Sequence, residues 1–111
     1  MVGQVGFGPG WERRADDVPD ELGDDRPLVP GLAHLWHLFV LPQWWGTEVA
    51  RKLHELALAE MREQGYERTR LFTPSLHARA RRFYERRGWS AVDEQHNSEL
   101  GLDMTEYRLE L

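Results

Sequence analysis

The sequence has no cysteine, no long apolar run and no excess of basic charge. The lack of cysteine excludes disulfides, thiolate metal sites and a cysteine nucleophile. No apolar stretch approaches the ~20 residues of a membrane helix, and the N-terminus lacks the regions of a signal peptide. A net charge of −5 argues against nucleic acid as the main partner. We therefore expect a cytoplasmic protein with neither a membrane nor a nucleic-acid partner.

The residues that are present are those of a small globular domain. The chain has 111 residues, 41% of them hydrophobic, with five tryptophans. Charge is unevenly distributed, because residues 67–89 hold seven arginines against two glutamates in an otherwise acidic chain. This segment is either a solvated helix face or a binding surface for an anionic ligand such as phosphate.

Hydrophobic periodicity predicts a sequence of strands and helices. The apolar run Leu32–Leu41 indicates a buried strand that ends at Pro42. Apolar residues at helical spacing predict a helix over Thr47–Gln64, which Gly65 ends. The remaining expected elements are strands at Met1–Gly8, Arg68–Thr73, Trp89–Gln95 and Thr105–Leu111 and a helix at His77–Arg87.

Pro9–Pro30 is expected to be a long acidic loop, which either covers a binding site or lacks fixed structure. A helix between two strands implies that those strands are parallel neighbours. The predicted fold is therefore α/β (α+β), with a mixed, mostly antiparallel sheet around a central parallel pair. Its order is strand, long loop, strand, helix, strand, helix, strand, strand.

The turn between the buried strand and the long helix predicts an anion site. It contains Gly46 and small or polar neighbours, and it leaves backbone N–H groups unpaired at the positive end of a helix. Alone this is a weak signal, because many strand–helix turns contain one glycine. The glycines of Gly3–Gly8 are not followed by a helix pattern and do not indicate a phosphate loop.

Two segments at the right separation make the signal specific. Residues 45–53 (WGTEVARKL) begin the long helix, and residues 77–89 (HARARRFYERRGW) match the pattern N-x-x-A-x-x-F-Y-x-x-x-G-F at Ala80, Phe83, Tyr84 and Gly88. The chain thus resembles the GNAT superfamily of N-acetyltransferases over roughly residues 33–89. The resemblance implies a single partial GNAT domain over residues 1–111, lacking the family's first strand, two helices and second strand.

Three positions depart from the family pattern. Trp45 stands where the family has Gln or Arg, and Glu48 replaces the first motif glycine, placing a carboxylate where pyrophosphate would lie. Ala50 fits the last motif position. His77 replaces the customary Asn but keeps a hydrogen-bonding group.

The resemblance implies an acetyl-CoA-dependent transfer of an acetyl group to an amine of a small molecule or protein. The alternative is a non-catalytic domain that binds coenzyme A or acts as a scaffold. The residues that the resemblance assigns to the coenzyme are Leu38, Val40, Trp45, Gly46, Thr47, Glu48, Val49, Ala50, Arg51, His77 and Ala80. One or two of Arg51, Arg79, Arg81, Arg82, Arg86 and Arg87 are expected to meet its phosphates.

Two residues are candidates for catalysis. Tyr84 takes the place of the family tyrosine that donates to the departing sulfur, or else it is a core aromatic beside Phe83. The resemblance makes His34 the candidate base, because family bases often lie six residues before the last apolar residue of this strand, here Val40; otherwise it is a structural histidine. Strand alternation puts it on the face of Trp36 and Leu38. The same alternation points His37 the other way, so no metal site is expected. Self-association is expected through the uncharged edge strand Met1–Gly8, as a homodimer or as aggregation. The alternative is that Pro9–Pro30 folds back over this edge as a lid.

Overall fold

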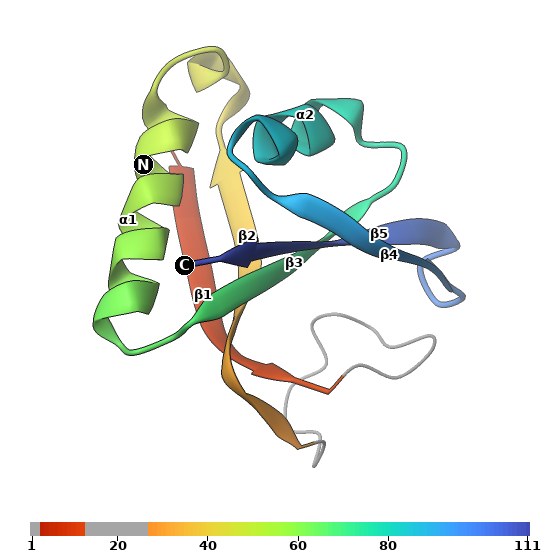
Figure 1. Cartoon of the computed structure of the whole chain (residues 1–111). Coiled ribbons are helices and arrows are strands. Elements are labelled where there is room, and N and C mark those ends of the chain that lie inside the picture. Colours follow the sequence, from red (N-terminus) through yellow and green to blue (C-terminus); the bar gives the residue numbers. More distant parts are fainter. Residues whose placement is uncertain (1–2, 13–26) are drawn as a thin grey trace.

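Five strands form one mixed sheet in the order β1-β2-β3-β5-β4 (Figure 1). The computed structural model describes residues 3–12 and 27–111. Its strands are β1 (Gly3–Trp11), β2 (Leu28–Val40), β3 (Arg68–Pro74), β4 (Ser90–Asn97) and β5 (Leu102–Glu110). Its helices are the short 3-10 turn η1 (Pro42–Trp44), α1 (Val49–Glu63) and α2 (Ala78–Arg86). The predicted order and the central parallel pair, β2 with β3, are confirmed.

The first two strands are longer than the sequence indicated. Pro9 and Pro30 lie inside strands, and the pairing of β1 with β2 extends to Trp11 opposite Leu28. Proline is tolerated in β1 because an edge strand leaves half of its N–H groups outside the ladder. The predicted loop Pro9–Pro30 is therefore wrong at both ends, and its middle, residues 13–26, lies outside the described residues.

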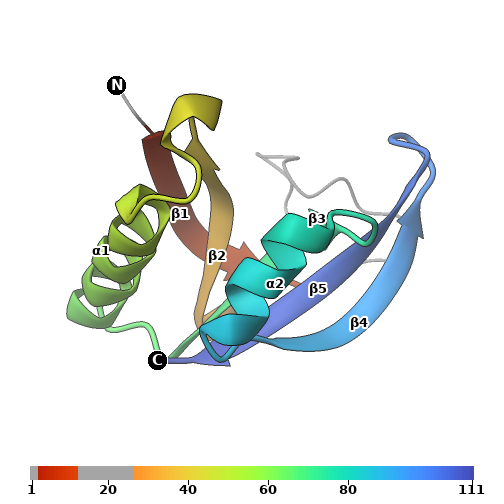
Figure 2. The same cartoon turned by 90° about the horizontal axis from the view of Figure 1, so that it is seen from above.

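Both helices pack on the same face of the sheet (Figure 2). The core between them and the strands comprises Ala33, Leu35, Ala57, Leu58, Met61, Leu71, Tyr84, Trp89 and Tyr107. We call this side the helix face and the opposite side the outer face. Among the described residues, no helix is both long and apolar enough to cross a membrane.

A β-bulge at Trp36 interrupts the alternation of β2. Gly6 pairs with His37 and Phe7 with Leu35, so Trp36 is an extra residue on β2. As a result Leu35 and Leu38, three residues apart, both pack on the helix face. The expectation of a strand buried throughout is wrong for its second half, where Trp36 and Phe39 are 48% and 44% exposed.

The parallel pair in the middle of the sheet is short. β2 and β3 pair only from Leu32 opposite Arg68 to His34 opposite Arg70. Beyond this point the two strands diverge (Figure 1), so the second half of β2 pairs with no described strand on its β3 side. The resulting fork leaves backbone donors and acceptors of β2 available to a ligand.

Candidate active site

A cleft of about 600 Å³ opens where β2 ends, between the turn before α1 and the helix α2. Its walls come from three parts of the chain, namely the end of β2, the turn and first residues of α1, and the helix α2. The lining residues are Leu38, Phe39, Val40, Trp44, Trp45, Gly46, Thr47, Ala50, Arg51, His77, Arg79, Ala80, Arg82, Phe83, Tyr84, Arg86 and Arg87.

The N-terminus of α1 presents unpaired amides to this cleft. The Thr47 hydroxyl accepts from the Val49 amide at 3.3 Å, and the Lys52 amide donates to the Glu48 carbonyl. Within residues 3–12 and 27–111, the amides of Glu48, Ala50 and Arg51 donate to no acceptor. Free N–H groups at the positive end of a helix favour an anion.

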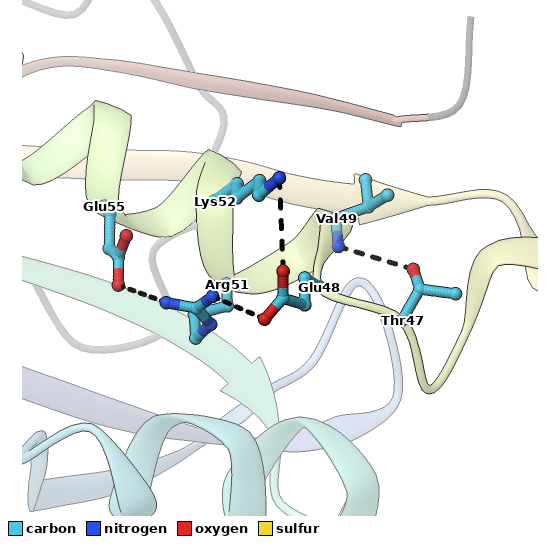
Figure 3. Close-up of polar contacts among 6 residues, drawn as sticks. All are labelled: Thr47, Glu48, Val49, Arg51, Lys52 and Glu55. Carbon is cyan, nitrogen blue, oxygen red and sulfur yellow. Dashed lines mark hydrogen bonds and ion pairs between the residues drawn. The ribbon is translucent and has the colours of Figure 1, made fainter.

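The carboxylate of Glu48 is turned along the helix toward Arg51 and Lys52 (Figure 3), and Glu48 is not among the residues that line the cleft. It accepts from Arg51 at 2.8 Å and lies 4.0 Å from the Lys52 ammonium. Arg51 also donates to Glu55 at 3.0 Å. These exposed ion pairs add little stability, but they neutralise a carboxylate that would otherwise repel an anion at the helix start.

The opposite wall begins at the N-terminus of α2. His77 caps this helix, because its Nδ1 accepts from the Ala80 amide at 3.3 Å. Nδ1 is therefore the acceptor, and in the neutral ring the proton is on Nε2, which can donate to a ligand. Ala80 is small and partly buried, so α2 approaches the cleft closely at this turn.

Tyr84 lies at the inner end of the cleft. Its ring packs against Phe83, Trp89 and Tyr107, and only 8% of its surface is exposed. Burial raises the pKa of Tyr84 to about 12, so its phenol stays protonated at neutral pH. No hydrogen bond joins its hydroxyl to any group in the described part of the chain. A protonated phenol with an uncommitted hydroxyl can donate to a ligand.

The arginines of α2 divide into two groups. Arg81 is turned away from the cleft, since it donates to the Tyr107 hydroxyl at 2.9 Å and to the Ser75 carbonyl at 3.0 Å. Arg81 is therefore not one of the arginines that can meet a ligand in this cleft. Four others line the cleft, namely Arg79, Arg82, Arg86 and Arg87.

A second cavity of about 520 Å³ continues the cleft between α1 and the end of α2. The two cavities share Arg51, Arg86 and Arg87, and the second adds Arg62. No described carboxylate forms an ion pair with Arg62, Arg86 or Arg87. Burial, together with Arg51 and Arg86, lowers the pKa of Arg87. The positive charge here is incompletely neutralised, and an anion would relieve it.

The histidine at the floor of this second cavity is neutral. His54 is buried and its Nε2 accepts from the Trp89 indole at 2.9 Å. Burial first, and the charge of Arg87 second, lower its pKa to about 4. His54 therefore contributes a fixed hydrogen bond to the core and no charge at neutral pH.

A cleft with a helix N-terminus, a basic rim and an inner phenol is the arrangement that the resemblance implied. The family model for the acetyltransferase (GNAT) domain matches residues 22–111. The chain belongs to the GNAT family. No curated protein sequence matches it significantly.

Solved structures of GNAT proteins have the same fold. A putative GNAT acetyltransferase from Desulfovibrio desulfuricans superposes with a TM-score of 0.75 at 26% identity. The NatC complex bound to Gag peptide and CoA also gives 0.75, at 19% identity. Each match covers 99% of this chain and 61% of the other, so the chain spans less than two thirds of these neighbours. An Elizabethkingia anophelis GNAT acetyltransferase with acetyl-CoA bound gives 0.67 at 13% identity, covering 72% of this chain and 61% of that one.

Most of the residues that the GNAT pattern assigned to the coenzyme meet in the cleft. They are Leu38, Val40, Trp45, Gly46, Thr47, Ala50, Arg51, His77 and Ala80, together with Tyr84. Glu48 and Val49 lie at the start of α1 without lining the cleft. The Glu48 carboxylate, which the family pattern placed near the pyrophosphate, has two cationic partners on its own helix, Arg51 and Lys52.

His34 is not among the residues that line the cleft. His34 lies on the outer face, between Ala33 and Leu35 of the core, and the bulge at Trp36 turns Leu38 to the helix face, so the prediction that His34 shares a face with Leu38 is wrong. There its Nδ1 accepts from the Arg70 guanidinium at 3.2 Å, and its ring packs between Trp11 and Phe72. Arg70 can only donate, so the Nδ1 lone pair is already used.

Three aromatic residues of the cleft were missed by the sequence reasoning, namely Phe39, Trp44 and Phe83. Phe39 follows the bulge, whose position depends on the partner strand. Trp44 adjoins Trp45 in a turn with no period from which a direction could be read. Phe83 was interpreted as a motif residue that does not face a ligand. Its ring also makes a cation–π contact with the Arg87 guanidinium, which lies 3.7 Å from the ring centre.

Proposed function

We propose that this protein transfers an acetyl group from acetyl-CoA to an amine of a small molecule or a protein. The observation that carries the proposal is the joint lining of one cleft by the start of α1, the arginines of α2 and Tyr84. The start of α1 would hold the pyrophosphate, and the arginines of α2 would hold the 3′-phosphate. Tyr84 would face the thioester. The coenzyme-bound GNAT neighbours support the same use of the cleft.

The reaction forms a C–N bond and breaks the C–S bond of the thioester. The amine attacks the carbonyl carbon, and backbone N–H groups of β2 beyond the fork would stabilise the developing oxyanion. Tyr84 would donate to the sulfur as it leaves. Proton transfer from a phenol with a pKa of about 12 to a thiolate of pKa ~8.5 is uphill. We therefore assign to Tyr84 hydrogen-bond donation to the nascent thiolate, with solvent completing its protonation.

The candidate from the sequence for the base that deprotonates the amine is His34, at the last paired position before the fork. Its bond from Arg70 counts against the role, because taking up a proton at Nδ1 breaks that bond. For the acceptor we propose a peptide amine as one class, which the peptide-bound NatC neighbour supports.

Calorimetry with acetyl-CoA tests the coenzyme assignment. We expect saturable binding, and a stabilisation of ~2.7 kcal/mol at one hundred times Kd. The 3′-dephospho analogue should bind about tenfold more weakly, and this gap should shrink in the double variant Arg86→Gln/Arg87→Gln. The matched control is Arg81→Gln, whose guanidinium lies outside the cleft and should leave the gap unchanged.

Thiol release with a panel of amines then separates the two functional classes. Turnover of acetyl-CoA with any amine supports the transferase. Binding without turnover across small amines and peptide N-termini supports the non-catalytic coenzyme-binding or scaffolding domain. Absence of binding at millimolar acetyl-CoA, in a folded sample, contradicts both.

We also propose a homodimer in the cytoplasm, joined through β1. This strand is an edge of the described sheet and carries no charged residue from Gly3 to Trp11. Beside it, the outer face exposes Trp36. Sedimentation at low micromolar concentration should show a dimer that Gln4→Lys converts to monomer, because lysine on an edge disfavours strand addition. A wild-type monomer contradicts the proposal.

A further inference from the structure

The side chain of Trp45 lines the cleft and contacts both the end of β2 and helix α2. Its indole Nε1 donates to the Val40 carbonyl at 2.8 Å, so it is tied to the end of β2. The guanidinium of Arg79, on α2, lies 4.7 Å from the centre of the same ring. One half-exposed residue in the turn before α1 thus joins the two opposing walls.

Both groups that Trp45 holds are ones a coenzyme could use. Val40 is the last residue of β2, beyond the fork, where it pairs with no described strand on its β3 side. Its carbonyl is therefore an acceptor for an amide N–H of a chain lying in the cleft, and the pantetheine arm of coenzyme A carries two amides. Arg79 forms no ion pair within the described residues and is a free cation for a phosphate.

We propose that Trp45 and Arg79 form a latch, which acetyl-CoA must open to bind. In the closed state the indole N–H takes the place of a pantetheine amide on the Val40 carbonyl, and the ring keeps Arg79 from the coenzyme. In the open state both groups turn to the coenzyme. The inference rests on the proposed function, and it makes the residue at position 45 a determinant of coenzyme affinity.

The latch is weak enough to be opened by a ligand. Trp45 is 53% exposed, and its two contacts are one neutral hydrogen bond and one exposed cation–π pair. Together such contacts correspond to about five- to tenfold in an equilibrium constant. A closed state favoured by this factor lowers the apparent affinity for acetyl-CoA by the same factor.

The test is Trp45→Phe, which keeps an aromatic ring under Arg79 and removes the N–H. We expect acetyl-CoA to bind about fivefold more tightly by calorimetry, and the gain to lie in the association rate measured by stopped flow. The dissociation rate should change by less than twofold, because the open complex is the same. Trp36→Phe is the control, since it removes an indole N–H from the outer face and should change neither rate.

The outcomes separate this inference from the proposed function. If the wild type binds acetyl-CoA and Trp45→Phe binds equally or more weakly, the latch is wrong and the coenzyme site stands. A gain confined to the dissociation rate also overturns the latch, because it indicates a new contact. If neither protein binds, the proposed function fails and the latch fails with it. Circular dichroism of each variant confirms that it is folded.

Discussion

Each face of the sheet buries one candidate catalytic side chain, and the two differ in their hydrogen bonds and in their access to the cleft. On the helix face Tyr84 is 8% exposed, packs among aromatic rings and opens onto the cleft with its hydroxyl uncommitted. On the outer face His34 is 2% exposed, and it is fixed by Arg70 outside the cleft lining. Burial alone therefore does not identify a reacting group. Access to the cleft and a free hydrogen-bonding atom distinguish the two.

The largest effect should come from removing the hydroxyl on the helix face. Tyr84→Phe should lower kcat by about 10²-fold, because only the interaction with the leaving sulfur is lost. The dissociation constant of acetyl-CoA should stay within twofold of the wild type. Parallel loss of binding and rate would make Tyr84 a packing residue.

The control for this variant is the neighbouring tyrosine. Tyr107→Phe removes a hydroxyl that bonds to Arg81 and Glu85 and does not line the cleft. We expect a small loss of stability and an unchanged kcat. An equal fall of kcat in both variants would remove the distinction between the two hydroxyls.

The outer face should respond in stability rather than in rate. His34→Ala leaves the buried Arg70 donor without its acceptor, and should cost about 1–3 kcal/mol in denaturant unfolding. His34→Gln, which keeps an acceptor, should recover part of this. If His34 is instead the base, both variants flatten the acidic limb of the pH–rate profile, and this result would overturn our comparison.

A second buried histidine gives the helix face its own pH dependence. The pKa of His54 is lowered to about 4 in the folded state, against 6.5 when unfolded, so the unfolded chain takes up the proton first as pH falls. The stability is complete above pH 6.5 and decreases as the pH falls toward 4. By pH 5 the loss should reach about 2 kcal/mol.

Chemical denaturation at several pH values checks this. In His54→Gln, whose side-chain oxygen can still accept from Trp89, the loss between pH 6.5 and 5 should be smaller by about that amount. A wild-type stability that is flat over this range contradicts a neutral, buried His54.

Much of the fold could be predicted from the sequence because its signals are local. The helix period of α1, the apolar run of β2 and the motif around Tyr84 lie within single segments, and they give the element order and most of the cleft. What could not be predicted depends on partners far along the chain. The bulge at Trp36 is set by pairing with β1, and it puts His34 and Leu38 on opposite faces.

The same reason explains why the direction of Arg81 could not be predicted, whereas that of Glu48 could. Arg81 and Arg82 are adjacent in sequence and equally basic, yet only Arg81 meets the Tyr107 hydroxyl from β5. Glu48 departs from the family pattern, but its orientation follows from Arg51 and Lys52 at helical spacing, a signal that was present in the sequence. Reading those spacings would have placed Glu48 correctly.

A crystal structure of the protein with coenzyme A would show directly whether the cleft between α1 and α2 holds the coenzyme. We predict the pyrophosphate on the amides of Glu48, Ala50 and Arg51, the pantetheine arm along the unpaired edge of β2, and the sulfur within hydrogen-bonding distance of the Tyr84 hydroxyl. Coenzyme bound elsewhere, or a sulfur on the outer face beside His34 and out of reach of Tyr84, would contradict the account.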